Sequence, residues 1–175
     1  SILQPWASLV VHGHKKIETR SWNPKYRGEL LIHASAKFTK QQENLSHEFY
    51  MMLRDSRIYH CPRGAIIGKV NLVDTITTNE FAIGNECRIW HPVYDYEGQS
   101  YLELTEQEMA FGDYSPNRFG WLLSDPVLFD EPIPCKGQLG IWNLPTGLEQ
   151  NIKTQLLQTV LTDNEIYELN NPTRP

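Results

Sequence analysis

The stretch of sequence that decides the fold opens with QPWASL at residues 4–9 and continues with GHKKIETRSW at residues 13–22. Proline suits the first turn of a helix and glycine its end, so residues 4–13 predict a short helix. Apolar and charged side chains alternate over residues 16–22, which predicts a strand with Ile17 and Thr19 on one face. The chain therefore begins with a helix followed by a strand.

Working outward, the pattern predicts further short elements. Strands are predicted at residues 29–34, 65–76, 118–123, 127–129 and 138–144, and helices at residues 38–53 and from residue 148 onward. Phe49 and Met52 are predicted to face the core from the first of these helices. Residues 77–116 are polar and irregular and predict a long connection. Short strands with two or three helices predict an α+β fold around a small β-barrel with flanking helices.

The chain shows no internal repeat and no low-complexity segment. We expect one domain over residues 1–145. Residues 146–175 are expected to form a helical C-terminal extension, because the apolar pattern there returns to helical spacing. This extension is predicted to pack on the barrel or to bind a partner protein.

The charge of the chain is unevenly distributed. Its net value is −5, which argues against a protein that coats the backbone of duplex DNA. Residues 1–40, however, carry seven Lys and Arg against two Glu, whereas the remainder carries nine against nineteen Asp and Glu. A basic segment on an acidic body indicates one local anion-binding site. A solvated charge cluster without a ligand is the alternative.

Several classes of protein are not indicated. The apolar runs are too short to cross a bilayer, and no secretory leader is recognisable. The three cysteines lack a CxxC or metal-ligand spacing, which favours free thiols in a reducing compartment. We expect a cytoplasmic protein, or a nuclear one if the source is eukaryotic. No nucleotide-cofactor or zinc motif occurs, so we expect no cofactor, no metal and no membrane partner.

Glu18 and Arg20 lie two apart on the predicted strand and therefore share a face. Such a pair can be a plain ion pair. It can also be a preorganised edge, in which the carboxylate accepts from an exocyclic amine and the guanidinium holds a phosphate or carbonyl. Residue types alone leave both interpretations open.

The motif string resembles the ASCH family, the activating-signal-cointegrator homology domains of the PUA-like superfamily. The resemblance rests on QPWASL, on G-x-K-x-x-E-x-R-x-W at residues 13–22, on YRG at residues 26–28 and on LIHA at residues 31–34. It continues through residues 64–74, 111–121 and 132–137. It covers about residues 1–145 in order and implies a PUA-like small β-barrel with a basic cleft beside the first helix.

The resemblance implies binding of RNA or other single-stranded nucleic acid, or of a nucleoside or nucleotide held by its base. Phosphate would meet basic side chains, rings would stack on the base, and polar groups would read its edges. The predicted ligand-binding residues are Gln4, Trp6, Lys15, Glu18, Arg20, Trp22, Tyr26, Arg27, Asp113, Tyr114, Arg118 and Lys136.

Two alternatives remain open. Some small members of the family hydrolyse N4-acetylcytidine with a G-x-K-x-x-T-x-R motif and a later glutamate. Here Lys15 matches the lysine, Glu18 stands at the threonine position, and Asp74 is the nearest later carboxylate, so these three are the catalytic candidates of an amidohydrolase acting on N-acyl nucleosides. Desolvation and cationic neighbours such as Lys16 and Arg20 would lower the pKa of Lys15, and Glu18 would raise it. The other alternative is a protein-interaction module in transcription or RNA metabolism.

Overall fold

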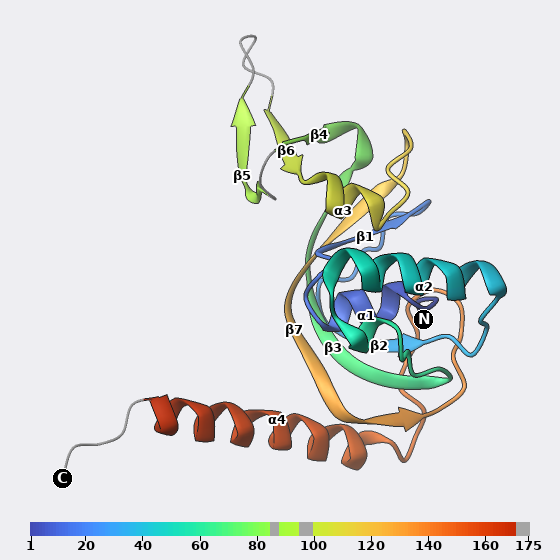
Figure 1. The fold of residues 1–175 in the computed structure, drawn as a ribbon, viewed down its shortest axis with the longest axis vertical. Helices are drawn as coiled ribbons and strands as arrows, with labels where there is room; N and C mark the ends of the chain where they lie inside the picture. Colours follow the sequence, from blue (N-terminus) through green and yellow to red (C-terminus); the bar gives the residue numbers. More distant parts are fainter. Residues whose placement is uncertain (85–87, 95–99, 171–175) are drawn as a thin grey trace. The chain divides into compact units, whose positions relative to one another are not determined.

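The structure is a computed structural model that describes residues 1–84, 88–94 and 100–170. Its fold is mixed α+β, with an antiparallel sheet and flanking helices, as the sequence predicts (Figure 1). In chain order the elements are α1 (Trp6–Val11), β1 (Ile17–Arg20), β2 (Gly28–Ala34), α2 (Lys40–Leu53), η1 (Ser56–Ile58), β3 (Ala65–Thr77), η2 (Thr78–Glu80), β4 (Phe81–Ile83), β5 (Arg88–Tyr94), β6 (Ser100–Leu104), α3 (Glu106–Ala110), β7 (Phe119–Pro134) and α4 (Glu149–Asn170).

The strands form two sheets. The larger has the order β1-β7-β3-β2, which makes β1 an edge strand. β1 runs antiparallel to β7, with Glu18 opposite Trp121 and Arg20 opposite Phe119. The smaller sheet has the order β4-β6-β5, in which β4 is parallel to β6 and β5 is antiparallel to it. Closure of the larger sheet into a barrel stays a prediction.

The chain divides into two compact units, each with its own core. Unit 1 contains residues 1–11, 31–69 and the chain from residue 127 onward, and unit 2 contains residues 12–30 and 70–126. The core of unit 1 includes Ile66, Phe129, Ile133 and Ile152. The core of unit 2 includes Ile17, Leu102, Leu104 and Leu122. The predicted boundary at residue 145 is not tested by this division and stays a prediction.

The long irregular connection predicted for residues 77–116 is wrong. The smaller sheet and α3 lie in this segment, because Leu102 and Leu104 alternate into the core of unit 2 beside Ile17. The two strands predicted at residues 118–123 and 127–129 are one strand, β7, which continues through the left-handed backbone of Asp125 (φ 49).

Two further predictions are wrong. Residues 138–144 contain no strand, and within them Leu139 is 99% exposed and Gly140 has a positive φ of 71. Met52 does not reach the core and is 48% exposed. The buried side of α2 instead follows the spacing of Gln42, Ser46 and Phe49, which are separated by four and three residues.

The C-terminal helix is present as predicted, and α4 begins at Glu149. Ile152 packs into the core of unit 1, and Leu148 and Leu156 pack against the same cluster. The Gln155 Oε1 atom accepts a hydrogen bond from the backbone N–H of Glu131 in β7, at 3.1 Å. No helix in the described ranges combines the length and apolar character needed to cross a membrane.

Candidate functional site

Lys15 is a buried lysine two residues before β1. It continues the inward-facing series of Ile17 and Thr19, and only 1% of it is exposed. Its Nζ atom has no hydrogen-bond partner among the described residues. The nearest acidic oxygen is Glu18 Oε2 at 4.0 Å. A buried ammonium without hydrogen bonds costs free energy, so stability alone does not explain this lysine.

The charge state of Lys15 depends on opposing effects. Burial lowers the pKa of Lys15 from its usual range, Glu18 and then Glu108 raise it, and Arg20 lowers it. Burial is the largest of these effects, so it decides the direction that the sequence left open. The pKa of Glu108 is raised, also chiefly by burial, and Lys15 acts against that rise.

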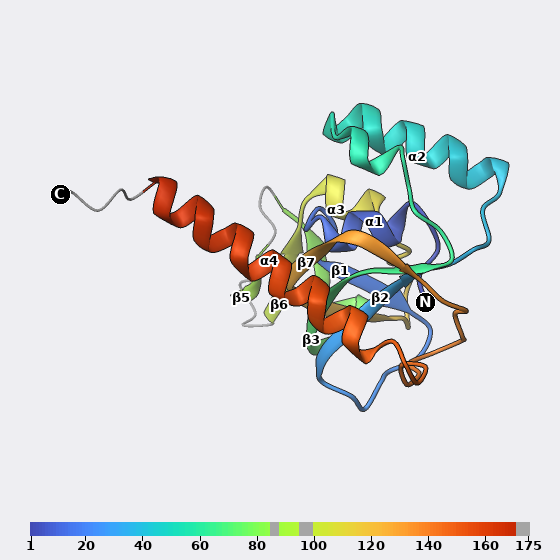
Figure 2. The same cartoon turned by 90° about the horizontal axis from the view of Figure 1, so that it is seen from below.

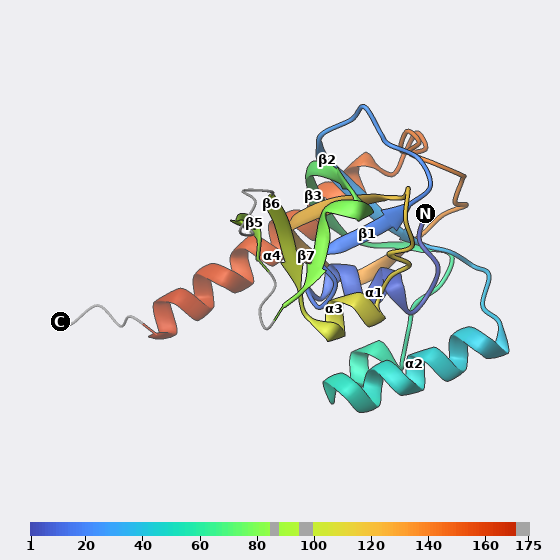
Figure 3. The ribbon, with the colours of Figure 1, turned by 90° about the horizontal axis from the view of Figure 1, so that it is seen from above.

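Glu108 is the acidic partner that the sequence analysis missed. It lies on α3, is 4% exposed, and accepts hydrogen bonds from the backbone N–H groups of Lys16 and Ile17, all at 3.1 Å. Figure 3 shows α3 beside the start of β1. The sequence signal was Thr105 three residues before Glu108, a pattern typical of a helix capping box. Glu108 also lies 3.4 Å from the Tyr114 hydroxyl, which donates to it.

Glu18 and Arg20 share a face of β1, as their spacing predicts, and they form a partly exposed ion pair. The Arg20 Nη2 atom lies 2.9 Å from Glu18 Oε1, with 33% of the arginine side chain and 12% of the glutamate side chain exposed. Trp121 stands opposite Glu18 in β7, and the Trp22 ring packs edge-on against it with ring centres 4.8 Å apart. A carboxylate, a guanidinium and an exposed indole therefore lie together. We name Lys15, Glu18, Arg20, Trp22 and Glu108 the β1 site.

Residues 112–118 form a loop that is fastened to β1. The Thr19 hydroxyl accepts from the Asp113 N–H at 3.1 Å, and the Thr19 carbonyl accepts from Arg118 Nη2 at 3.3 Å. Arg118 also forms an ion pair with Asp113 at 3.3 Å. Hydrogen bonds from Ser115 hold the pKa of Asp113 below its usual range. A Cβ atom on Gly112 would lie 3.2 Å from Lys15 Nζ, so this glycine permits close coverage of the ammonium.

Arg27 and Asp74 pair with each other. Arg27 Nη2 lies 3.0 Å from Asp74 Oδ1 and 2.6 Å from Thr75 Oγ1, and Arg27 Nη1 donates to the carbonyls of Pro24 and Tyr26 at 2.9 Å. This network holds the turn before β2 against β3. The carboxylates that raise the pKa of Lys15 are those of Glu18 and Glu108, and Asp74 is not among them.

Tyr26 and Tyr114 have local contacts in unit 2. The Tyr26 hydroxyl donates to the Glu29 carbonyl at 2.7 Å, and its ring lies under Gly28. The Tyr114 ring packs edge-on against Phe81, with ring centres 5.5 Å apart. Tyr114 is linked to Glu108 of the β1 site by the hydrogen bond from its hydroxyl, whereas Tyr26 supports its own turn.

Three predicted ligand-binding residues belong to unit 1. Gln4 is fully buried, and its amide donates to the Pro62 carbonyl at 2.7 Å and accepts from the Ser8 N–H at 3.0 Å. Trp6 packs edge-on against Phe49, and Lys136 is exposed. The structure thus brings Lys15, Glu18 and Arg20 together within unit 2. Convergence of Gln4, Trp6 and Lys136 on the same ligand stays a prediction.

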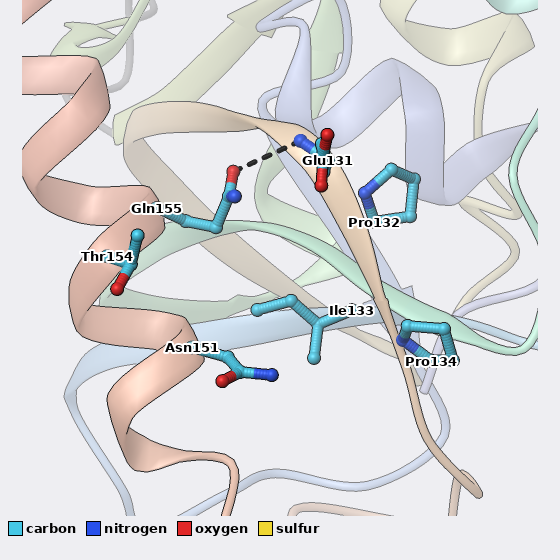
Figure 4. A pocket seen from close by; sticks show the side chains of 7 residues that line it. All are labelled: Glu131, Pro132, Ile133, Pro134, Asn151, Thr154 and Gln155. Atoms are coloured by element: carbon cyan, nitrogen blue, oxygen red, sulfur yellow. Dashed lines mark hydrogen bonds between the residues drawn. The ribbon is translucent and has the colours of Figure 1, made fainter.

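A groove of about 270 Å³ lies in unit 1, where the end of β7 meets α4 (Figure 4). It is lined by Glu131, Pro132, Ile133, Pro134, Asn151, Thr154 and Gln155. Its lining contains no Lys or Arg, so it lacks the charge expected for a phosphate-binding site. The basic cleft predicted around the first helix stays a prediction.

The described residues contain no cluster of three or more metal-ligating side chains. Cys61 and Cys135 are free thiols, and Cys87 lies outside the described residues. His12 and His14 stack with ring centres 6.5 Å apart.

Comparison with known proteins identifies relatives of the chain. Residues 1–119 match the family model of the ASCH domain. Activating signal cointegrator 1 from Homo sapiens is 29% identical over 162 residues, which cover 90% of this chain and 24% of that protein. The Mus musculus protein of the same name is 28% identical over the same shares. The chain thus spans about a quarter of the length of these relatives. A crystal structure of a ZmASCH mutant protein from Zymomonas mobilis aligns with a TM-score of 0.46 and 17% identity, over 87% of this chain and 93% of that one.

Proposed function

Because the chain belongs to the ASCH domain family, a PUA-like family associated with nucleic-acid binding, we propose that it binds single-stranded RNA by holding a base or nucleotide at the β1 site. The observation that carries the proposal is the Glu18–Arg20 pair. Its atoms lie 2.9 Å apart, both side chains are partly exposed, and the buried Lys15 lies 4.0 Å from the same carboxylate.

This arrangement suits the polar edge of a base. Arg20 Nη2 lies 2.9 Å and Lys15 Nζ lies 4.0 Å from the oxygens of the Glu18 carboxylate, which can also accept a hydrogen bond from an exocyclic amine. Arg20 has further N–H donors and is more exposed than Glu18, which suits a phosphate or a ring carbonyl. The pair therefore supplies an acceptor and a donor side by side.

Trp22 supplies the stacking surface. It is 39% exposed, and its edge-on contact with the buried Trp121 fixes the ring. The Trp121 Nε1–H donates to the Trp22 carbonyl at 3.4 Å, which fixes the backbone as well. Stacking of one base on such a ring contributes about 1–3 kcal/mol and tolerates every base. Specificity would then come from Glu18 and Arg20.

The test is fluorescence anisotropy with labelled single-stranded RNA of about ten nucleotides, together with titration of the four nucleoside monophosphates. Trp22→Ala and Arg20→Gln should each weaken binding by about tenfold, and the Arg20 variant should also reduce the salt dependence. Lys153→Gln removes an exposed cation from α4 and is the matched control. Equal affinity of wild type and both β1-site variants would refute the proposal.

A second function, hydrolysis of N-acyl nucleosides, is favoured by one observation. Burial lowers the pKa of Lys15, so a fraction of this amine is neutral at a lower pH than for an exposed lysine. A neutral amine can accept a proton from water or attack a carbonyl. Glu108, whose carboxylate acts on Lys15 from α3, would be the later acidic residue in place of Asp74.

This second function is tested by incubating the protein with N4-acetylcytidine and other N-acyl nucleosides and measuring the released acid. Activity that Lys15→Met abolishes and Asp74→Asn leaves intact would support it. No release from any substrate in the panel would contradict it.

A further inference from the structure

A second surface with aromatic and basic side chains lies in unit 1. On α2, His47, Tyr50 and Met51 are separated by three and four residues from the first, so they form one stripe along the helix, and Arg54 follows as the left-handed residue that caps its C-terminus. This stripe is separate from the buried side of α2. His47, Met51 and Arg54 are exposed, and Tyr50 is half-buried.

The turn after α2 extends this stripe. Figure 2 shows η1 folded back alongside α2. The ring of Tyr59, which follows η1, lies 6.1 Å from the His47 ring and 6.1 Å from the Tyr50 ring, and His60 lies 5.2 Å from Tyr59. The His47 and Tyr50 rings are 6.3 Å apart. Four aromatic rings therefore form one connected cluster. We name the following residues the α2 patch: His47, Tyr50, Met51, Arg54, Tyr59 and His60.

Much of the ring cluster is exposed, and the turn after α2 is anchored elsewhere. Ile58 anchors η1, because it is fully buried. Tyr59, by contrast, is 44% exposed, as is Met51, and His60 is exposed. Exposed aromatic rings are groups on which planar ligands such as bases can stack.

The charge around the patch is positive although the chain is acidic. Residues 37–63 carry five Lys and Arg against three Asp and Glu, whereas the whole chain has a net charge of −5. Arg57 is neutralised by Asp55, with contacts of 2.8 and 2.6 Å. Arg54 contacts the Met51 sulfur and has no ion-pair partner among the described residues. Its guanidinium therefore remains available for an anion.

We propose that the α2 patch binds a second segment of single-stranded nucleic acid, with bases stacked on Tyr59 and His47 and a phosphate paired with Arg54. The charge of the patch favours nucleic acid over an apolar protein surface as the partner. Arg54 can pair with a phosphate of a polyanion, and the neighbouring rings can stack with its bases. The proposal is separate from the function proposed for the β1 site, since all of its residues belong to unit 1.

The experiment uses the full chain and a labelled oligo(rU) of about twenty nucleotides. Tyr59→Ser and Arg54→Gln should each weaken binding of this probe by about fivefold to tenfold, and Tyr59→Trp should restore it. Met52→Ser is the matched control, because Met52 is 48% exposed on α2 and lies outside the stripe. Wild-type affinity of both patch variants would overturn the proposal.

A direct readout covers the case in which Tyr59→Ser fails to fold. Wild-type protein is crosslinked by ultraviolet light to the same probe carrying 5-bromouridine and is then digested with trypsin. Adducts on the peptides of residues 41–54 or 58–63 would support the proposal, and adducts confined to other peptides would overturn it. The proposal would also be overturned if the wild-type chain self-associates and Tyr59→Ser abolishes this self-association but leaves oligonucleotide binding unchanged. The partner of the patch would then be a second copy of the chain.

The two proposals can fail separately. Nucleoside monophosphates report on the β1 site and should be unaffected by the patch variants. If monophosphates and Trp22→Ala show no effect but the twenty-nucleotide probe still requires Tyr59, the function proposed for the β1 site fails and the α2 patch stands.

Discussion

Gln4 and Lys15 are both buried polar residues of one motif string, yet their surroundings differ. The Gln4 amide is satisfied at both ends, by the Pro62 carbonyl and the Ser8 N–H. The Lys15 ammonium has no hydrogen bond among the described residues and lies 4.0 Å from a carboxylate. A satisfied buried group stabilises a fold, whereas an unsatisfied one costs stability. The comparison therefore assigns Gln4 to the architecture of unit 1 and Lys15 to the chemistry of unit 2.

The largest expected change in stability follows from substitution of Gln4. Gln4→Leu should lower the free energy of unfolding by about 2–4 kcal/mol, because it leaves a buried N–H and a carbonyl without partners. Urea denaturation followed by circular dichroism measures this loss. Gln41→Leu is the control, because Gln41 is exposed on α2. A loss below about 0.5 kcal/mol would show that the Gln4 amide is not structural.

The next effect concerns Glu108. Glu108→Ala removes the acceptor of the Lys16 and Ile17 N–H groups and should cost about 2 kcal/mol. Glu108→Gln keeps one acceptor oxygen and should cost less. Thermal unfolding of both variants measures the difference. Equal losses would indicate that charge, and not backbone hydrogen bonding, is the contribution of Glu108.

The Lys15→Met substitution should not lower the free energy of unfolding, in contrast to the substitutions of Gln4 and Glu108. Replacing an unsatisfied buried ammonium with an apolar chain of similar length should leave stability unchanged or raise it by about 1 kcal/mol. RNA binding should fall by about tenfold, because Glu18 loses the cation behind it. Denaturation and anisotropy on the same sample measure both. A Lys15→Met variant that loses stability by more than about 1 kcal/mol would place Lys15 with Gln4 as a structural residue.

The stability gap between wild type and Lys15→Met should depend on pH. Burial lowers the pKa of Lys15 in the folded state below the value of 10.5 taken for the unfolded chain. At a pH between the folded-state pKa and the unfolded-state pKa, the unfolded chain therefore binds more protons than the folded one. Wild-type stability then rises with pH in that interval, and the gap closes as the pH approaches 10.5. Urea titrations from about pH 8 to about pH 10 test this, because ordinary carboxylates are ionised throughout that range. A stability difference between wild type and Lys15→Met that widens as the pH rises would contradict a lowered pKa for Lys15.

The smallest effect is expected at Asp74. Its side chain is 66% exposed and pairs with Arg27 at 3.0 Å. Asp74→Asn should change the free energy of unfolding by less than about 0.5 kcal/mol and should leave RNA binding unchanged. A loss of binding comparable to that of Arg20→Gln would return Asp74 to the candidate site.

The fold class and the β1 pair could be read from local pattern. Alternation over residues 16–22 places Glu18 and Arg20 on one face, and strand geometry then brings them into contact. Glu108 could not be found in this way. Its sequence context favours a bond to the start of its own helix, but its carboxylate bonds to Lys16 and Ile17, more than ninety residues away. Only long-range packing creates that contact.

The sequence by itself determined the α+β class, the ASCH family and the side-by-side placement of Glu18 and Arg20, because these depend on motif order and on the two-residue period of a strand. The tertiary structure decided which buried polar groups are satisfied. Hydrogen-bond partners such as Pro62 for Gln4 and Glu108 for the start of β1 come from distant segments, and burial, which lowers the pKa of Lys15, is a property of the packed chain.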